Sequence, residues 1–392
     1  MRAASISGVN PLWEFLRARA VEIHVADHLR ERIERGDKLR VKLGLDPTAP
    51  DLHVGHLVVL DVLRAFQDHG HTVVPIVGDF TGLIGDPSGR SEMRPILTRE
   101  QIDANAKTYF DQIFKILDPD KTEIHGNAEW SLELDAADVL RLMGKATLQQ
   151  VLAREDFATR LKEGTPVGAH EILYPFMQGY DSVPIHADVE IGGTDQLFNL
   201  LFAREVQRAY GQEPEDIMVF PLLEGLDGKQ KMSKSLGNYI GISEPPEEIY
   251  GKTMSIPDTL TERYLRLVSG LAGAEVDELL KLPPRDAKAA LAGQLVRRLH
   301  GEEAAGAAEA DFDRKFRQRA LPEEIPEKKV TSAELVDALV ETGLARSRGD
   351  ARRLLDQAGV RVNGEKANGG SELADGDVIQ VGKRNFVRVR LG

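Results

Sequence analysis

Residues 40–56 read RVKLGLDPTAPDLHVGH, and this stretch predicts how the first half of the chain folds. Residues 40–45 alternate apolar side chains in the pattern of a short β-strand. Residues 54–69 place apolar side chains at helical spacing, and Gly70 can end that helix. A strand that leads directly into a helix is the unit at which open α/β sheets bind nucleotides.

The same alternation of strands and helices continues beyond this stretch. Strands are predicted over 72–77, which is β-branched and continuously apolar, and over 217–222. One helix is predicted to follow Thr98, which forms a capping-box signature with Gln101, and another to begin at Thr194. Strands that alternate with helices predict an α/β fold with a doubly wound parallel sheet.

The composition changes after about residue 245, which indicates further domains. Residues 258–320 are rich in Ala, Leu, Glu and Arg, which favours helices. The segment 321–329, LPEEIPEKK, carries two prolines and several charges and is a candidate linker. Helices and then short strands are expected in the tail. The predicted domains are an α/β domain at 1–240, a helical domain with the linker at 241–325, and a small α+β module at 330–392.

Bulk composition excludes several classes of protein. The chain has no cysteine, which excludes disulfides and thiolate chemistry and fits a reducing cytoplasm. Its apolar runs are far shorter than the roughly 18–20 residues of a membrane span, and Glu14 and Glu22 interrupt any secretory signal. The net charge is −13, but residues 331–392 carry +1, so the rest carries −14. A less acidic tail is compatible with local contact to RNA.

The segment 46–56 has features of a phosphate site. A helix N-terminus offers free N–H groups and a positive dipole end to phosphates, and Gly55 allows a close approach to the backbone. His53 and His56 are three residues apart and share a helix face, so either can donate hydrogen bonds to phosphate or ribose. The alternatives are two surface histidines at a helix start, or a metal site, for which no third ligand stands out nearby.

A second basic motif, Lys-Met-Ser-Lys-Ser, occupies residues 231–235. It follows an apolar strand and a glycine-rich polar stretch. Two lysines on a mobile loop can close over a polyphosphate and neutralise the charge of a leaving pyrophosphate. The alternative is an ordinary solvated basic turn.

Together, the two motifs resemble the HIGH and KMSKS signatures of class I aminoacyl-tRNA synthetases, with Val54 in place of isoleucine. Three further segments are similar to the tyrosyl-tRNA synthetase family of bacteria: GLIGDPSGR at 82–90, YPFMQGYD at 174–181 and GGTDQ at 192–196. Taken one at a time, they read as a turn, an aromatic helix face and a helix cap. The resemblance covers most of residues 40–240 and implies a Rossmann-like catalytic domain.

The resemblance also implies a role for each matching residue. The tyrosine-binding residues would be Asp86, Tyr174 and Gln178 at the amino group, Asp181 at the phenolic hydroxyl and Gln196 near the carboxylate. The ATP-binding residues would be Gly44, Asp46, Gly55, Gly193 and Asp195. The catalytic residues around the adenylate and pyrophosphate would be Thr48, His53, His56, Arg90, Arg94, Lys231, Lys234 and Ser235. A buried group that pairs with the substrate hydroxyl would be left unsatisfied by phenylalanine, so such a site rejects phenylalanine. This family is a known example of such discrimination.

One position departs from the family pattern. Many members have a tyrosine two residues before the glycine at position 44, where it also touches the substrate hydroxyl. This chain has Lys42 there. A cation cannot play the same neutral role, so the expected recognition of the phenol rests on Asp181 alone.

The tail resembles a small RNA-binding module named after a ribosomal small-subunit protein. The similar segments are 345–355, ARSRGDARRLL, and 360–364, VRVNG. The residues expected to contact phosphates are Arg346, Arg348, Arg352 and Arg353. The alternative is an ordinary basic helix surface. Tyrosyl enzymes of bacteria carry this module at this end, and the related tryptophanyl enzymes are not expected to.

The resemblance predicts a tyrosine–tRNA ligase that uses ATP and acts on tRNA(Tyr), as a homodimer in the cytoplasm. Magnesium is expected to arrive with the ATP phosphates, and no metal held by the protein is expected. Three alternatives stay open. They are a relative that activates tryptophan, an RNA-binding or regulatory protein without catalysis, and an enzyme that adenylates an acceptor other than tRNA.

Overall fold

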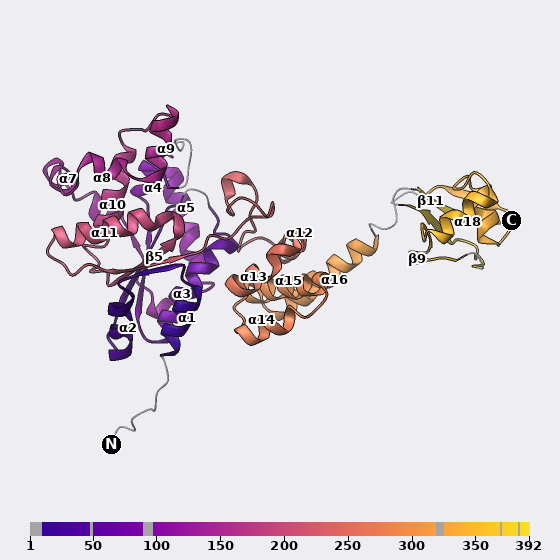
Figure 1. The fold of residues 1–392 in the computed structure, drawn as a ribbon, viewed down its shortest axis with the longest axis horizontal. Helices are drawn as coiled ribbons and strands as arrows, with labels where there is room; N and C mark the ends of the chain where they lie inside the picture. The colour runs from indigo at the N-terminus through magenta and orange to yellow at the C-terminus, as the bar shows by residue number, and fades with distance from the viewer. Residues whose placement is uncertain (1–9, 48–49, 89–96, 319–324, 369–370, 383–384) are drawn as a thin grey trace, which may run out of the picture. The chain divides into compact units, whose positions relative to one another are not determined.

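The computed structural model describes residues 10–392 apart from 48–49, 89–96, 319–324, 369–370 and 383–384 (Figure 1). The chain forms two compact units, one that ends at Ala308 and one that begins at Glu309. Within the described ranges, no helix is long and apolar enough to cross a membrane.

A six-stranded sheet forms the centre of the first unit, with the strand order β1-β6-β5-β2-β3-β4. The strands from β6 to β4 run parallel, which confirms the predicted doubly wound sheet, and β1 adds an antiparallel edge. The strands are β1 (Glu22–His24), β2 (Arg40–Leu45), β3 (Thr72–Val77), β4 (His125–Gly126), β5 (Val189–Gly193) and β6 (Asp216–Phe220).

The direction of the winding reverses between β2 and β5. From β2 the sheet grows outward through β3 to β4, and the chain then returns to the other side of β2 to form β5 and β6. Open α/β sheets bind ligands at such a reversal, beyond the carboxyl ends of the strands. The residues that end and follow β2 and β5 are therefore at the expected nucleotide site.

The connecting helices start where the sequence signals indicated. The helix predicted from residue 54 begins as the 3-10 turn η1 (Val54–His56) and continues as α3 (Leu57–Asp68). Thr98 caps α5 (Arg99–Ile113) through the predicted capping box. The helix predicted from Thr194 begins as η4 (Thr194–Gln196) and continues as α11 (Leu197–Ala209).

The other helices of the sheet region lie between these elements. α10 (Tyr174–Asp181) packs against α11, where the rings of Phe176 and Phe202 have centroids 4.9 Å apart. The remaining elements are α1 (Pro11–Arg19), α2 (Ala26–Arg35), α4 (Thr81–Ile84), η2 (Pro119–Lys121), α6 (Ala128–Ser131), α7 (Ala136–Met143), α8 (Leu148–Leu152), α9 (Glu155–Glu163), η3 (Glu171–Leu173) and η5 (Lys234–Leu236).

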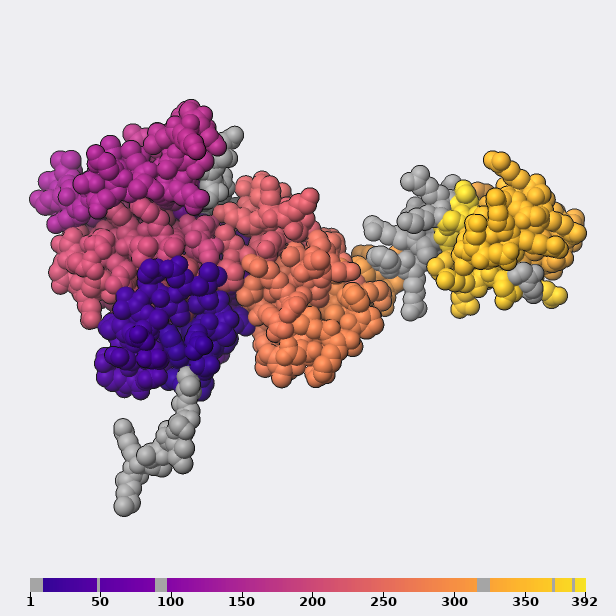
Figure 2. Space-filling model, viewed as in Figure 1, coloured from indigo at the N-terminus to yellow at the C-terminus, as the bar shows by residue number. Residues whose placement is uncertain are grey.

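Most of residues 246–318 fold into helices, as the composition of 258–320 predicts. Figure 2 shows the part of this segment that belongs to the first unit packed against the rest of that unit. Arg298 on α15 forms an ion pair with Asp61 on α3, with 2.5 Å between Nη2 and Oδ1. The elements are α12 (Pro246–Ser255), η6 (Asp258–Leu260), α13 (Thr261–Val268), α14 (Gly273–Leu279), α15 (Pro284–His300) and α16 (Glu302–Gln318).

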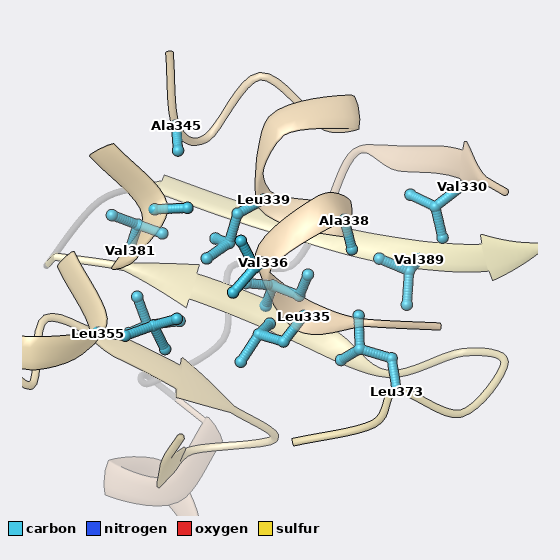
Figure 3. Packing of buried hydrophobic residues seen from close by; sticks show 13 residues of the cluster. Val330, Leu335, Val336, Ala338, Leu339, Ala345, Leu355, Leu373, Val381 and Val389 are labelled. Carbon is cyan, nitrogen blue, oxygen red and sulfur yellow. The ribbon is translucent and has the colours of Figure 1, made fainter. Parts of the chain in front are cut away.

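The second unit is a small α+β fold built on a five-stranded sheet of order β7-β11-β10-β8-β9. Its core includes Leu335, Leu339 and Val389, which point toward one another (Figure 3). The elements are β7 (Glu327–Val330), α17 (Leu335–Glu341), α18 (Arg348–Asp356), β8 (Val360–Val362), β9 (Glu365–Lys366), β10 (Val378–Val381) and β11 (Asn385–Leu391).

One part of the predicted linker is wrong. Residues 327–329 were expected in the linker because of their charges, but they belong to strand β7, which pairs in parallel with β11. The pairing satisfies backbone groups at the edge of the sheet, and it buries Val330 in the core. The charged side chains stay exposed on the strand.

Candidate active site

Several predicted residues converge at the carboxyl edge of the sheet. Gly44 and Asp46 lie at the end of β2, and Gly193 and Asp195 lie at the end of β5. These two strands are neighbours at the reversal of the winding. Three predicted residues, Thr48, Arg90 and Arg94, lie outside the described residues.

The two histidines of the first motif lie against each other at the start of η1. Their ring centroids are 3.9 Å apart, and His56 Nδ1 accepts a hydrogen bond from the His53 backbone N–H at 3.1 Å. Burial, and next the charge of Lys234, lowers the pKa of His56 to about 4. Burial likewise lowers the pKa of His53 well below its usual value. Both rings are therefore neutral at pH 7 and can act as hydrogen-bonding groups.

Gly55 lies close to the side chain of His53. A side-chain carbon added at Gly55 would lie 2.9 Å from Nδ1 of His53, so a larger residue would require the imidazole to move. The approach of a ligand to this glycine stays a prediction.

The lysine motif reaches both the sheet edge and α5. Lys231 Nζ donates to Asp195 Oδ2 at 2.8 Å. Lys234 Nζ donates to the hydroxyl of Tyr109 at 3.3 Å and lies 5.1 Å from the centroid of that ring. Burial lowers the pKa of Lys234 to about 8. Ser235, the last residue of the motif, has its Oγ 2.9 Å from that of Ser233.

A chain of hydrogen bonds runs from Tyr174 toward the interior. The Tyr174 hydroxyl donates to Asp46 Oδ2 at 3.0 Å, and the Thr81 hydroxyl donates to Asp46 Oδ1 at 2.8 Å. Asn127 Nδ2 donates to Thr81 Oγ1 at 3.0 Å and to Asp181 Oδ2 at 3.2 Å. The chain therefore joins a residue predicted to contact ATP to the residue predicted to bind the phenol.

Asp181 is a buried carboxylate at the end of α10. It accepts hydrogen bonds from the Trp130 indole at 2.8 Å and from Asn127. Burial raises the pKa of Asp181 to about 7, against the opposing effects of the Lys42 charge and these two donors. Near neutral pH, its carboxylate form can accept a hydrogen bond from a neutral hydroxyl.

One residue predicted at the amino group contacts the residue predicted near the carboxylate. Gln196 Nε2 donates to Asp86 Oδ2 at 2.8 Å. Gln178 Nε2 lies 3.5 Å from Glu190 Oε1, and its own Oε1 is buried without a hydrogen-bond partner in the described part of the chain. A buried carbonyl oxygen of this kind is suited to accept a hydrogen bond from an ammonium group.

Comparison with known families decides the identity of this arrangement. The family model for class I tRNA synthetases (W and Y) matches residues 34–317. The chain belongs to this family. The model for the S4 domain matches residues 335–379 in the second unit. The prediction of a class I synthetase with a C-terminal RNA-binding module is thereby confirmed.

Individual relatives of this synthetase agree with the family match. The tyrosine–tRNA ligase of Thermotoga maritima is 49% identical over 389 residues, which cover 97% of each chain. That of Bordetella pertussis is 51% identical, with 95% of this chain and 93% of the relative covered. A solved Archaeoglobus fulgidus tyrosyl-tRNA synthetase complexed with L-tyrosine is 26% identical with a TM-score of 0.62, over 76% of this chain and 99% of that one.

A buried arginine supports the segment of the synthetase that carries Asp86. Arg154 donates to Ser88 Oγ at 2.6 Å and to Asn199 Oδ1 at 2.8 Å, and its Nη2 lies 3.7 Å from Asp86 Oδ1. Its guanidinium carbon also lies 5.3 Å from the ring centroid of Phe157. The buried guanidinium of Arg154 therefore fixes the positions of Ser88, Asn199 and Asp86.

Replacing Arg154 with methionine is expected to lower the free energy of unfolding by about 3–5 kcal/mol, because buried acidic and polar partners lose their cation. Urea unfolding measures this loss. The matched control is Arg141→Met, which removes an exposed arginine from a surface ion pair with Asp138. That change should cost less than about 1 kcal/mol. Equal losses in the two variants would contradict the prediction.

The predicted RNA-binding arginines of the synthetase lie at and just before α18, and all four are exposed. Arg348 is paired with Asp337, and Arg353 Nη2 donates to Asp350 Oδ1 at 2.7 Å. Each of these two cations therefore already has an acidic neighbour. Arg346 and Arg352 are the other two members of the set.

The sequence missed several residues that shape the site. Trp130 and Asn127 were not singled out, although they directly follow β4, one of the parallel strands whose carboxyl ends face the site. Tyr109 was not singled out either, because a tyrosine on an amphipathic helix looks like a core residue. Among the described residues, no group of three His, Asp or Glu side chains could hold a metal ion.

Proposed function

We infer that this chain is a tyrosine–tRNA ligase, which activates L-tyrosine with ATP and transfers it to the 3′ end of tRNA(Tyr). The observation that carries the choice of amino acid is the buried Asp181 carboxylate with its two neutral donors, Trp130 and Asn127. These donors hold the carboxylate in place as an acceptor for the phenol. An amino acid without a hydroxyl would leave part of the acceptor capacity of this buried carboxylate unsatisfied.

In the proposed first step, a carboxylate oxygen of tyrosine attacks the α-phosphorus of ATP. A new P–O bond forms, the bond to the bridging oxygen breaks, and pyrophosphate leaves with the electron pair. The nucleophile is already charged, so positioning and electrostatic stabilisation supply the rate. We assign the stabilisation of the pyrophosphate to Lys231 and Lys234, and hydrogen bonds to phosphate to His53 and His56. Magnesium enters with ATP as part of the substrate.

In the proposed second step, a hydroxyl oxygen of the terminal ribose of tRNA attacks the carbonyl carbon of tyrosyl-adenylate. An ester bond forms, the bond from the carbonyl carbon to the phosphate oxygen breaks, AMP leaves with the electron pair, and the proton of the hydroxyl is released. We propose that the exposed arginines of α18 contact the tRNA phosphates, which is the use of arginine typical of nucleic-acid interfaces. A cytoplasmic location, expected from the absence of cysteine, is part of this proposal.

The test is exchange of pyrophosphate into ATP by the purified protein, with each of the twenty amino acids and without tRNA. Exchange with tyrosine alone is the expected result, and charging of tRNA(Tyr) is the next measurement. Exchange with tryptophan would keep the family and overturn the substrate. No exchange with any amino acid, in folded protein that binds ATP, would favour the RNA-binding alternative.

We also propose that the enzyme is a homodimer, as expected from the family. The support is three exposed leucines close in sequence: Leu132 after α6 is 64% exposed, Leu140 on α7 is 70% exposed and Leu148 on α8 is 53% exposed. Exposed large apolar side chains are typical of protein–protein interfaces.

Changing both Leu140 and Leu148 to glutamate is therefore expected to convert the dimer to a monomer, because charges in an apolar interface lose their hydration. Light scattering after gel filtration measures the mass. Val21, which is 59% exposed beside β1, provides the control variant Val21→Glu. A dimeric double variant, or a monomeric parent protein, would contradict the proposal.

A further inference from the structure

Lys42 is a fully buried cation inside the sheet, at the position where the family pattern has a tyrosine. Its Nζ lies 2.9 Å from Glu190 Oε1 on the neighbouring strand β5. It also donates to the backbone oxygen of Gln178 at 2.9 Å and to Ser182 Oγ at 2.8 Å. An ammonium group has three donors, so all three are used. Lys42 therefore has no donor left for a substrate hydroxyl.

A second buried acid extends this network. The Ser182 hydroxyl donates to Glu215 Oε1 at 2.9 Å, just before β6. One oxygen of Glu190 and one of Glu215 are buried without a partner in the described part of the chain. Burial, and next the charge of Glu190, raises the pKa of Glu215 well above its usual value. A proton on Glu215 can then bond the two carboxyl groups together, which leaves Glu190 as the charged partner of Lys42.

These charges act on Asp181 from the sheet side. The titratable groups that face it are Lys42 on β2, which favours its carboxylate form, and Glu190 on β5, which opposes it. Glu215, just before β6, acts on the pair of Lys42 and Glu190. The neutral donors are Trp130 on α6 and Asn127, the residue before α6. Two carboxylates thus share one cation when Asp181 is ionised.

The ionised form is the one that suits the phenol. Trp130 donates to Oδ1 of Asp181 and Asn127 donates to Oδ2, so both oxygens already face a donor. A proton on either oxygen would remove acceptor capacity from a carboxyl group that already accepts two hydrogen bonds. The ionised form therefore has more capacity left to accept the hydrogen bond of the phenol.

We propose that Lys42 is a specificity-determining positioning residue, which keeps Asp181 a carboxylate by its charge and fixes α10 through the backbone of Gln178. The proposal rests on the inferred activation of tyrosine and deepens it. The tyrosine that many family members have at position 42 contacts the substrate hydroxyl directly. Here the buried Lys42–Glu190 pair acts on that hydroxyl indirectly, through the charge of Asp181. Selection of tyrosine over phenylalanine then depends on a residue that the substrate does not touch.

The two members of the pair have opposite effects on Asp181, and this provides the test. Lys42→Met removes the favourable charge, so the pH at which kcat/KM for tyrosine is half-maximal should rise. Glu190→Gln removes the unfavourable charge, so the same midpoint should fall. A shift of one pH unit changes kcat/KM for tyrosine about tenfold on the acidic side of the profile. The value for phenylalanine should stay nearly constant with pH in both variants.

The double variant Lys42→Met/Glu190→Gln removes both charges together and avoids an unpaired buried ion, so it keeps the test open if a single variant fails to fold. Its midpoint should lie between those of the single variants. Glu205→Gln, which alters an exposed pair with Arg208, is the control and should leave the profile unchanged.

Three outcomes separate the possibilities. Opposite shifts in the two single variants support the proposal, and where only one single variant folds, a shift in that variant that the double variant reverses supports it. Shifts of the same sign, or equal losses for tyrosine and phenylalanine with an unmoved profile, would show a merely structural role and overturn it. If the parent protein does not exchange pyrophosphate with tyrosine, the inferred function itself fails.

Discussion

Replacing Lys234 with methionine is expected to slow tyrosine-dependent exchange of pyrophosphate into ATP by about 10²- to 10³-fold, the usual effect of removing a preorganised group from a developing charge. The lysine is half-buried beside Tyr109, and its charge lowers the pKa of His56, so it acts in a partly desolvated place. The loss should fall on kcat, with KM for tyrosine nearly unchanged. Single-turnover formation of tyrosyl-adenylate measures the step directly.

The pH dependence of the parent protein gives a second check on Lys234. Its pKa is lowered to about 8, so the ammonium loses its proton as the pH rises through that value. The profile of kcat/KM for ATP reports the free enzyme, and it should therefore decline above pH 8. This decline should be absent in Lys234→Met. The control is Lys229→Met, an exposed lysine of the same loop, and equal rates in the two variants would contradict the role of Lys234.

Replacing Asp181 with asparagine is expected to lower kcat/KM for tyrosine by roughly 10- to 100-fold, because a hydrogen bond to a charged group contributes about 1.5–3 kcal/mol. The value for phenylalanine should change little, since phenylalanine has no hydroxyl to pair. The ratio of the two kcat/KM values, from exchange assays, measures the loss of discrimination.

The acidic side of the pH profile tests the same residue. The pKa of Asp181 is raised to about 7, so its carboxylate is present above pH 7 and is lost as the pH falls. In the parent protein, kcat/KM for tyrosine should decline below pH 7, and Asp181→Asn should remove that decline. Glu129→Gln on α6 removes an exposed carboxylate next to Trp130 in sequence and is the control. An unchanged tyrosine preference in Asp181→Asn would exclude Asp181 as the phenol acceptor.

The sequence alone predicted β2, β3 and β6, because their apolar patterns are local signals. It did not predict β5, and the assignment of Gly44 and Asp195 to one site came from the family resemblance. Helix starts such as Thr98 were also predictable, because a capping box is a local signal. The strand β7 was not, since its charged residues resemble a linker until β11 supplies a partner.

The buried charges could not be predicted from the sequence. Lys42 looks like an exposed residue of an alternating strand, and its partner Glu190 is 148 positions away. Trp130 and Asp181 are likewise 51 positions apart. Such pairs form only when the strands and helices that carry them become neighbours in the fold. The pattern of one sequence does not show which elements become neighbours, because periodicity reports only which face of an element is apolar.

The hydrogen-bond chain from Asp181 through Asn127 and Thr81 to Asp46 has a thermodynamic consequence. Its two ends belong to the proposed sites of two different substrates, tyrosine and ATP. If one substrate orders this series of hydrogen bonds, the binding free energy of the other substrate changes. Linkage then requires reciprocity: the factor by which tyrosine changes the dissociation constant of ATP equals the factor by which ATP changes that of tyrosine.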